Sequence, residues 1–269
     1  MEVGTVGAGS IAGIIFTLVV SIGLPLALVL LLCKKTKAGA MSFLIGGATF
    51  FLFAMVLEQI LHFTVLGIFG EETLTGNIWV YGLYGGLAAA LFEETGRFIA
   101  MRFFMKKRLD LPNALMYGVG HGGVEAVLIV GLSSISNLIT SIMINSGGME
   151  STLNALDPAT AAATLEQLSA LWTLPAYQFF LGGAERVFAI FSHIAFSVLV
   201  YVAVRYKKKS GWILAFAMHF LVDFAAVVGM NYLPVVAVEG IVAILTAVTV
   251  CLAVRMIRAE KSEQDILSE

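Results

Sequence analysis

The sequence is short of charged residues. Only 13% of its 269 residues are Asp, Glu, Lys or Arg, compared with about 25% in an average soluble domain, and 59% are hydrophobic. A soluble domain of this length has too little interior to bury so much apolar surface, and a disordered chain would carry far more charge. The composition excludes both classes and indicates an integral membrane protein.

Three further absences narrow the function. The 2 cysteines, Cys33 and Cys251, are too few and too isolated for a disulfide framework or a cysteine metal site. The net charge is −2 and no stripe of basic and aromatic residues is present, so we expect no nucleic acid partner. No Lys or Arg precedes the first apolar run, so we expect that run to be retained as a span and not cleaved as a signal peptide.

Seven apolar segments are long enough to cross a bilayer, which takes about 20 helical residues. Apart from Arg97 and Arg186, every Lys and Arg lies near the end of the first, third, fifth or seventh segment or in the connection or tail that follows it. Because basic residues concentrate on the cytoplasmic side, we predict an all-α transmembrane bundle with its N-terminus outside and its C-terminus in the cytoplasm, in a bacterial or archaeal plasma membrane. The segments are 10–33, 41–66, 77–104, 113–144, 175–205, 211–230 and 234–257.

The chain shows no internal repeat and no linker. We therefore predict one integral membrane domain over 1–269, with its catalytic core over 77–230. The longest outer connection is 145–174, and within it Asp157-Pro158 has the features of a helix start, with Asp as the N-cap and Pro at the first helical position. This short helix is expected to be a structural loop helix or a lid over a membrane cavity.

Polar residues inside the apolar segments are the most informative feature. Each ionised group at mid-membrane costs about 2.5–3.5 kcal/mol on insertion scales, so such groups need partners or a water-filled cavity. They are Glu58, Glu93, Glu94, Glu125, Glu185, Asp223, Arg97 and Arg186, together with all four histidines, His62, His121, His193 and His219. Glu58 and His62 lie toward the outer half of their segment, and we expect no direct role for them.

Two segments show grouped polar residues at helical spacing. Glu93, Glu94 and Arg97 share one helix face, because spacings of three and four residues bring side chains together. Arg97 can hold one of the two carboxylates ionised and leave the other free as a base. His121 and Glu125 are four residues apart, and the glycines around His121 would let a neighbouring helix approach closely.

Two later segments carry similar groups. Glu185 and Arg186 precede His193 on the fifth segment, and His219 and Asp223 are four residues apart on the sixth. At 1.5 Å per residue, the polar groups of all four segments lie about 10–18 Å from the cytoplasmic ends of their helices. We therefore predict one shared site in the cytoplasmic half of the membrane.

Metal-assisted hydrolysis suits these residue types. Three histidines with acidic residues can bind a divalent metal, zinc most readily, and a nearby glutamate can deprotonate a bound water. The local HExxH signature of many zinc peptidases is absent from the sequence. Without a metal, a glutamate and histidine pair could still activate water and stabilise an oxyanion.

The motifs resemble those of the CAAX-protease and bacteriocin-processing superfamily of intramembrane peptidases, and most closely its PrsW-like and YhfC-type branches. PrsW-like proteins carry EExx followed by a basic residue, then FxxxxE, then HxxxD. Here these motifs run from Glu93 to Arg97, from Phe180 to Glu185 and from His219 to Asp223. The basic residue stands one position earlier than in the EExxxR of CAAX prenyl proteases, so a prenylated substrate is not implied.

The additional features at 121–125 and 185–193 resemble the YhfC-type branch of intramembrane metalloproteases. The resemblance implies a membrane-embedded peptidase that acts on a membrane protein or peptide, with Zn²⁺ or another divalent metal and no organic cofactor. In the peptidase that the resemblance implies, Glu93 or Glu94 activates water, and the histidines bind metal or stabilise the oxyanion. The predicted metal residues are His121, Glu125, His193, His219 and Asp223. The predicted catalytic residues are Glu93, Glu94, Arg97, Glu185 and Arg186.

Two other function classes use the same residues. A proton- or cation-coupled transporter also needs buried carboxylates and histidines, although the sequence shows no inverted repeat or paired broken helices. A membrane scaffold that has lost its activity is a third interpretation, and the complete set of costly buried charges argues against it. The sequence has no GxGD motif, which disfavours an aspartyl protease.

Overall fold

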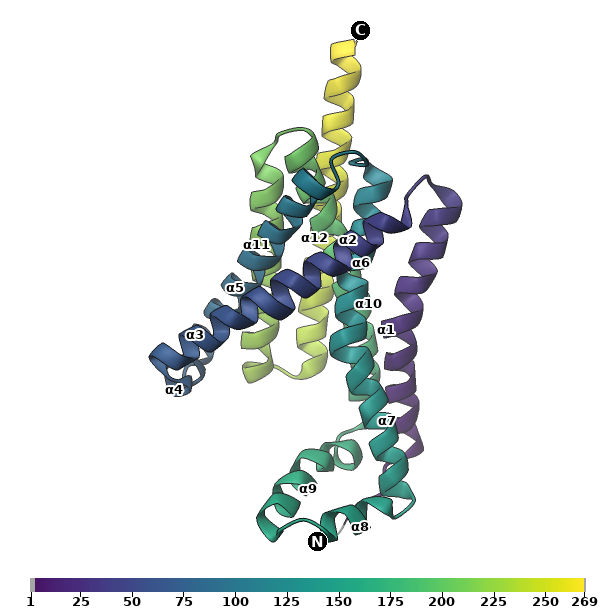
Figure 1. Ribbon diagram of the computed structural model, residues 1–269, viewed down its shortest axis with the longest axis vertical. Helices are drawn as coiled ribbons and strands as arrows, with labels where there is room; N and C mark the ends of the chain where they lie inside the picture. The colour runs from purple at the N-terminus through teal and green to yellow at the C-terminus, as the bar shows by residue number, and fades with distance from the viewer. Residues whose placement is uncertain (1–2, 269) are drawn as a thin grey trace. The chain divides into compact units, whose positions relative to one another are not determined.

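The computed structural model describes residues 3–268, which form helices joined by turns and contain no strand (Figure 1). The predicted all-α class is therefore confirmed. The elements are α1 (Ala8–Lys35), α2 (Ala40–Leu52), η1 (Phe53–Glu58), α3 (Gln59–Phe69), α4 (Glu71–Thr75), α5 (Ile78–Ile99), η2 (Ala100–Phe104), α6 (Leu111–Glu125), η3 (Ala126–Gly131), α7 (Leu132–Asn145), α8 (Gly148–Asn154), α9 (Pro158–Thr173), α10 (Ala176–Arg205), α11 (Lys209–Tyr232) and α12 (Val235–Ser268), where η marks a π-helical turn.

Six helical stretches among the described residues are long and apolar enough to cross a membrane. They are Ala8–Lys35, Ala40–Phe69, Leu111–Asn145, Ala176–Arg205, Lys209–Tyr232 and Val235–Glu260, and they correspond to six of the predicted segments. The other predicted segment, 77–104, is helical as α5 and η2, but its charged residues Glu93, Glu94 and Arg97 make it less apolar than the six. Its membrane crossing and the orientation of the chain stay predictions.

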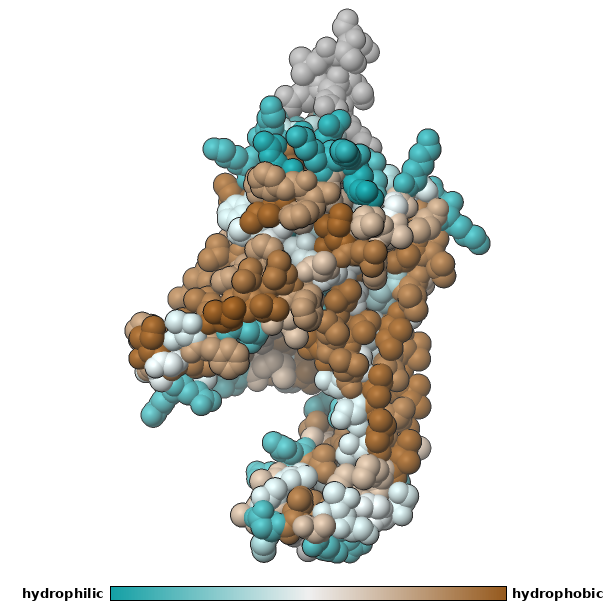
Figure 2. All heavy atoms as spheres, viewed as in Figure 1, coloured by the Kyte–Doolittle hydropathy of each residue, from teal (hydrophilic) through white to brown (hydrophobic). Residues whose placement is uncertain are grey.

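The surface of the helices agrees with a bilayer environment. Large apolar side chains such as Leu44, Phe51 and Ile213 are more than half exposed, where a soluble protein would carry polar residues. Figure 2 shows hydrophobic side chains over α2 and α5, and hydrophilic ones at the end where the α5–α6 and α10–α11 connections lie. The protein is an integral membrane protein.

The chain divides into two compact units. Unit 1 contains the residues up to Gly23 and Ala126–Val187, and unit 2 contains Leu24–Glu125 and the residues from Phe188 onward. The single domain over 1–269 stays a prediction from the sequence.

Unit 1 has its own apolar core around α8 and α9. The predicted helix start is confirmed, because the Asp157 side chain accepts hydrogen bonds from the backbone N–H groups of Ala159 and Thr160, and Pro158 is the first residue of α9. Hydrogen bonding from Thr160 holds the pKa of the Asp157 carboxyl below its usual range. The buried core residues are Val6, Ile14, Ile144, Met149, Leu153, Ala161 and Leu171. Two of them belong to α9, so α9 packs as a structural helix of this unit, and a lid function stays a prediction.

Unit 2 is built around the second half of α10. Residues from Ala195 to Val204 supply much of its buried core, with α5 packed on α11, α2 on α6, and α11 on α12 (Figure 1). Helix starts and ends follow local sequence signals. Gly70, at a φ of 78°, ends α3, and the Asn77 side chain accepts hydrogen bonds from the first backbone N–H groups of α5.

Glycines set how closely α2 and α6 approach. A Cβ placed on Gly46 would lie 2.1 Å from the Tyr117 carbonyl oxygen, and one on Gly120 would lie 2.0 Å from the Phe43 carbonyl oxygen. Backbone atoms at that distance cannot move aside cheaply, so only glycine fits. The predicted close approach around His121 is confirmed, and it places that imidazole in the interior of unit 2.

We expect the Gly46→Ala substitution to destabilise the protein. Alanine improves helix propensity by about 1 kcal/mol, but the clash with α6 would cost about 1–3 kcal/mol or more, so the melting temperature in detergent micelles should fall. The matched control is Gly67→Ala on α3, where nothing lies within 4 Å of the added methyl group and stability should be unchanged or higher. Equal effects of the two substitutions would contradict the packing described for α2 and α6.

Candidate functional site

One carboxylate oxygen lies at the centre of a buried polar cluster in unit 2. Glu93 on α5 places Oε2 2.8 Å from Nε2 of His121 on α6. The same oxygen lies 3.9 Å from Nδ1 of His193 on α10 and 4.0 Å from Nε2 of His219 on α11. All four side chains are buried. The structure thus brings together groups that the sequence places on four separate helices.

The neighbouring carboxylate, Glu94, is held on both oxygens. Arg97 Nε donates to Oε2 at 3.0 Å, and His219 Nδ1 lies 2.8 Å from Oε1. The backbone carbonyl of Glu94 accepts a further hydrogen bond from Trp212 Nε1 at 3.0 Å. The sequence left open which of the two glutamates Arg97 pairs with, and the structure pairs it with Glu94. Glu93 is therefore the carboxylate without an arginine partner, and it lies beside His121, His193 and His219.

Arg97 ties α5 to α10. It is fully buried, and its Nη1 donates to Ser197 Oγ at 2.6 Å and to the His193 carbonyl oxygen at 3.2 Å. The guanidinium carbon lies 5.9 Å from the ring centroid of Tyr117 and 6.0 Å from that of Phe196, within the range of a cation–π interaction. These contacts compensate the cost of burying the cation and fix the position of its partner Glu94.

The Arg97 contact also determines the tautomer of His193. Arg97 Nη2 lies 3.1 Å from His193 Nδ1, and a guanidinium can only donate, so Nδ1 accepts and carries a lone pair. The ring proton of a neutral His193 is then on Nε2, which faces Glu125 Oε2 at 2.5 Å. A carboxylate behind a histidine in this way orients the ring, as is common for metal ligands.

The other two imidazoles are held in place by packing and by carboxylates. The His121 and His193 rings stack with centroids 4.9 Å apart, and His219 stacks on Phe196 at the same separation. His219 Nε2 lies 3.4 Å from Asp223 Oδ2. His121 Nδ1 is buried and has no hydrogen-bond partner among the described residues, which leaves it a lone pair when Nε2 donates to Glu93.

The cluster fits a divalent cation. Glu93, His121 and His193 each offer a ligand atom, and these atoms lie within 4.8 Å of one another. Metal–ligand bonds of about 2.0–2.2 Å place ligand atoms about 3–4 Å apart, so small side-chain rotations would complete the site. Glu125 and Asp223, which were predicted as ligands, lie against His193 and His219 outside this group of three, and their role as ligands stays a prediction.

Glu185 and Arg186 belong to unit 1. Arg186 Nε and Nη2 donate to the Glu185 carboxylate next to it in the chain, so the two charges are paired with each other on α10. The catalytic roles predicted for them stay predictions.

Glu58 and His62 form a separate pair in unit 2. His62 Nε2 lies 3.2 Å from Glu58 Oε1, and His62 Nδ1 lies 2.8 Å from the Tyr84 hydroxyl. Glu58 is the last residue of the π-helical turn η1. The pair contributes a contact between this helix and α5, and the absence of a direct role stays a prediction.

Two residues of the cluster were not singled out from the sequence. Ser197 stands four residues after His193 on α10, and its Oγ donates to the His193 carbonyl while accepting from Arg97. The four-residue spacing is a signal that could have found it. Trp212, which binds the Glu94 carbonyl, carries no such signal, because its contact depends on the packing of α11 on α5.

Together the fold and the cluster define an integral membrane protein with a buried histidine–glutamate site contributed by four helices. Residues 17–246 match the family model described as YhfC intramembrane metalloprotease, and the chain belongs to the YhfC family. It is 38% identical over 231 residues to the "Uncharacterized membrane protein YhfC" of Bacillus subtilis (strain 168), an alignment that covers 84% of this chain and 88% of the relative. No solved structure gives a significant match. The YhfC-type resemblance of the motifs is therefore confirmed.

We expect a strong energetic coupling between Glu94 and Arg97. Replacing Arg97 by Met alone would remove the cation beside Glu94 and leave Oε2 of this buried carboxylate without its partner, at a cost of about 3–5 kcal/mol. The double variant Arg97→Met with Glu94→Gln should cost clearly less than the sum of the single variants, measured as unfolding free energies in detergent. Arg258→Met, at an exposed position of α12, is the control and should have little effect. Additive single effects would show that the pair does not hold this part of the site together.

Proposed function

We propose that the protein is an intramembrane metallopeptidase in which Glu93 activates water for hydrolysis of a peptide bond. The observation that carries the proposal is the position of Glu93 Oε2, which lies within 4.0 Å of nitrogen atoms of three buried histidines. The family description supports the same chemistry.

Two imidazoles and one carboxylate have separate tasks in this proposal. His121 and His193 would hold a divalent ion, with His193 using Nδ1 in place of its contact with Arg97 Nη2, while Glu93, the third possible ligand, stays off the ion as the base. The ion would supply a Lewis acid to polarise the scissile carbonyl and acidify a water molecule. Imidazole ligands suit zinc and several other first-row metals, so the donor set does not select one metal. Glu93 accepts the proton of the attacking water and passes it to the leaving amine.

The other residues of the cluster position these groups. Glu94 is unsuited to accept a proton, because Arg97 and His219 occupy both of its oxygens. Arg97 fixes the backbone at His193, because its Nη1 donates to the His193 carbonyl oxygen. His219 Nε2 lies 3.4 Å from Asp223 Oδ2 and 4.0 Å from Glu93 Oε2. Because Nδ1 donates to Glu94, the imidazolium form of His219 would donate from Nε2 to the carbonyl oxygen and stabilise its developing negative charge.

The substrate follows from the surroundings of the cluster. Its side chains are buried within apolar helices, so a peptide bond must reach them from the membrane, and we propose a membrane protein or membrane-bound peptide as substrate. The location of the site in the cytoplasmic half of the membrane rests on the distribution of basic residues along the sequence.

The Glu93→Gln variant tests the proposal. It keeps the size of the side chain and removes its ability to accept a proton, so hydrolysis should fall by a factor of about 10²–10⁴ while the fold and the metal content are retained. The measurement is mass-spectrometric mapping of new peptide termini in membranes that contain the wild type or the variant, in water enriched in ¹⁸O. New carboxyl termini labelled with ¹⁸O should appear only with the wild type.

The control is Glu166→Gln, at an exposed position of α9 in unit 1, which should leave the termini unchanged. Loss of metal from Glu93→Gln would make Glu93 a ligand and contradict its role as proton acceptor. If the wild type and Glu93→Gln give identical termini and the protein transports cations in liposomes, the peptidase proposal is contradicted and a transporter function is supported.

A further inference from the structure

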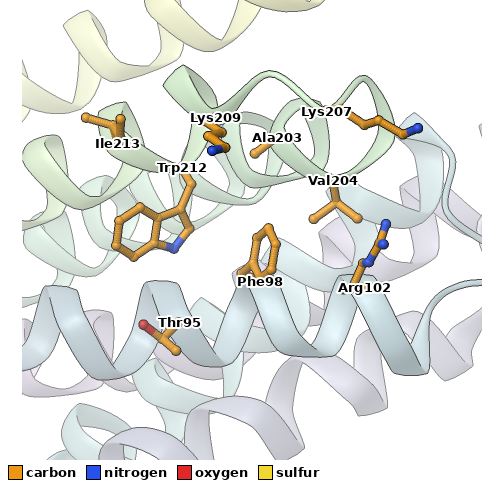
Figure 3. A pocket seen from close by; sticks show the side chains of 9 residues that line it. All are labelled: Thr95, Phe98, Arg102, Ala203, Val204, Lys207, Lys209, Trp212 and Ile213. Carbon is orange, nitrogen blue, oxygen red and sulfur yellow. The ribbon is translucent and has the colours of Figure 1, made fainter.

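A cavity of about 580 Å³ opens between α5, the end of α10 and the start of α11 in unit 2. Figure 3 shows Phe98, Val204 and Trp212 facing one another across it, with basic side chains around them. The volume lies in the range of small-molecule sites. Ile213, on the same wall, is 57% exposed, so the cavity is accessible from the apolar surface of the helices.

Its lining has positive charge and no negative charge. Arg102 on η2, Lys207 in the α10–α11 connection and Lys209 at the start of α11 line the cavity, and no Asp or Glu does. Among the described residues none of the three makes an ion pair, whereas the adjacent Lys208 lies 3.6 Å from Glu260. Lys207 has a φ of 59°, an uncommon conformation for a residue other than glycine. This turn places Lys207 and Lys209 at the cavity, whereas Lys208 contacts Glu260.

We propose that this cavity binds an acidic phospholipid. The phosphate of the headgroup lies at Arg102, Lys207 and Lys209, and an acyl chain lies along the wall formed by Phe98 and Trp212. The combination of an apolar wall with unpaired cations fits an amphiphilic anion, and basic pockets between membrane helices are suited to anionic headgroups. A soluble anion would gain nothing from the apolar wall.

The cavity shares a residue with the buried cluster. Trp212 forms its wall and donates to the Glu94 carbonyl oxygen at 3.0 Å, and Thr95, which follows Glu94, also lines it. A lipid packed on Trp212 would therefore hold the indole in the position that it needs for this hydrogen bond. The lipid site does not depend on the proposed peptidase activity and is tested without it.

The experiment compares lipids added to the purified full-length protein in detergent. Dioleoylphosphatidylglycerol should raise the melting temperature and stay bound in native mass spectrometry, and dioleoylphosphatidylcholine should do neither. The triple variant Arg102→Gln, Lys207→Gln, Lys209→Gln should lose affinity for the acidic lipid by about tenfold or more. The matched control, Lys34→Gln, Lys35→Gln, Lys37→Gln, changes the charge equally at exposed positions in the last turn of α1 and just after it and should bind as the wild type does.

A second variant tests the cavity and keeps its charge. Ile213→Trp fills the open wall and should also reduce retention of the acidic lipid. Undiminished retention by this variant would mean that headgroups adsorb to the surface without entering the cavity, which would overturn the proposal. Equal losses in the two triple variants, or an equal rise in melting temperature with inorganic phosphate, would overturn it as well.

Discussion

The arrangement of unit 2 depends on one constraint, that carboxylates buried among apolar helices must be compensated. Glu93 and Glu94 are adjacent on α5 and both are buried, and their compensation is divided between them. Arg97 holds Glu94, and the histidines surround Glu93. Because the compensating groups come from α6, α10 and α11, the packing of these helices is tied to the charge balance of the site. Stability and the proposed chemistry therefore depend on the same contacts.

Most of the fold could be predicted from the sequence, because a bilayer leaves few choices to an apolar chain. The helices, the apolar segments and the start of α9 at Asp157-Pro158 all follow from local signals. The segment 77–104 shows the limit of that reasoning. Counting apolar residues predicted a span, but the charged residues that α5 contributes to the buried cluster also make it too polar to rank with the six apolar stretches. The surroundings of α5 therefore depend on the helices that pack against it and cannot be deduced from its hydropathy alone.

The residue types of the site could be predicted from the sequence, but only some of the contacts between their side chains could. Helical spacing and depth put Glu93, His121, His193 and His219 in one predicted group, and the structure brings these four side chains together, because the position of a residue along a helix follows from the sequence. Which glutamate Arg97 binds could not be deduced, because both lie within its reach on one face and the choice depends on Ser197 and His193 of another helix. The pairing of Glu185 with Arg186 similarly depends on side-chain geometry that spacing alone does not define.

The proposed chemistry requires that the imidazoles beside Glu93 form a metal site. Elemental analysis by mass spectrometry of the purified protein tests it most directly, with the wild type measured beside His121→Ala and His193→Ala after confirmation that each variant is folded. We expect about one divalent ion per chain in the wild type, as for a single site of this donor set, and far less in both variants. Equal, near-zero metal in all three proteins after growth and purification with supplied zinc and other divalent metals would contradict it.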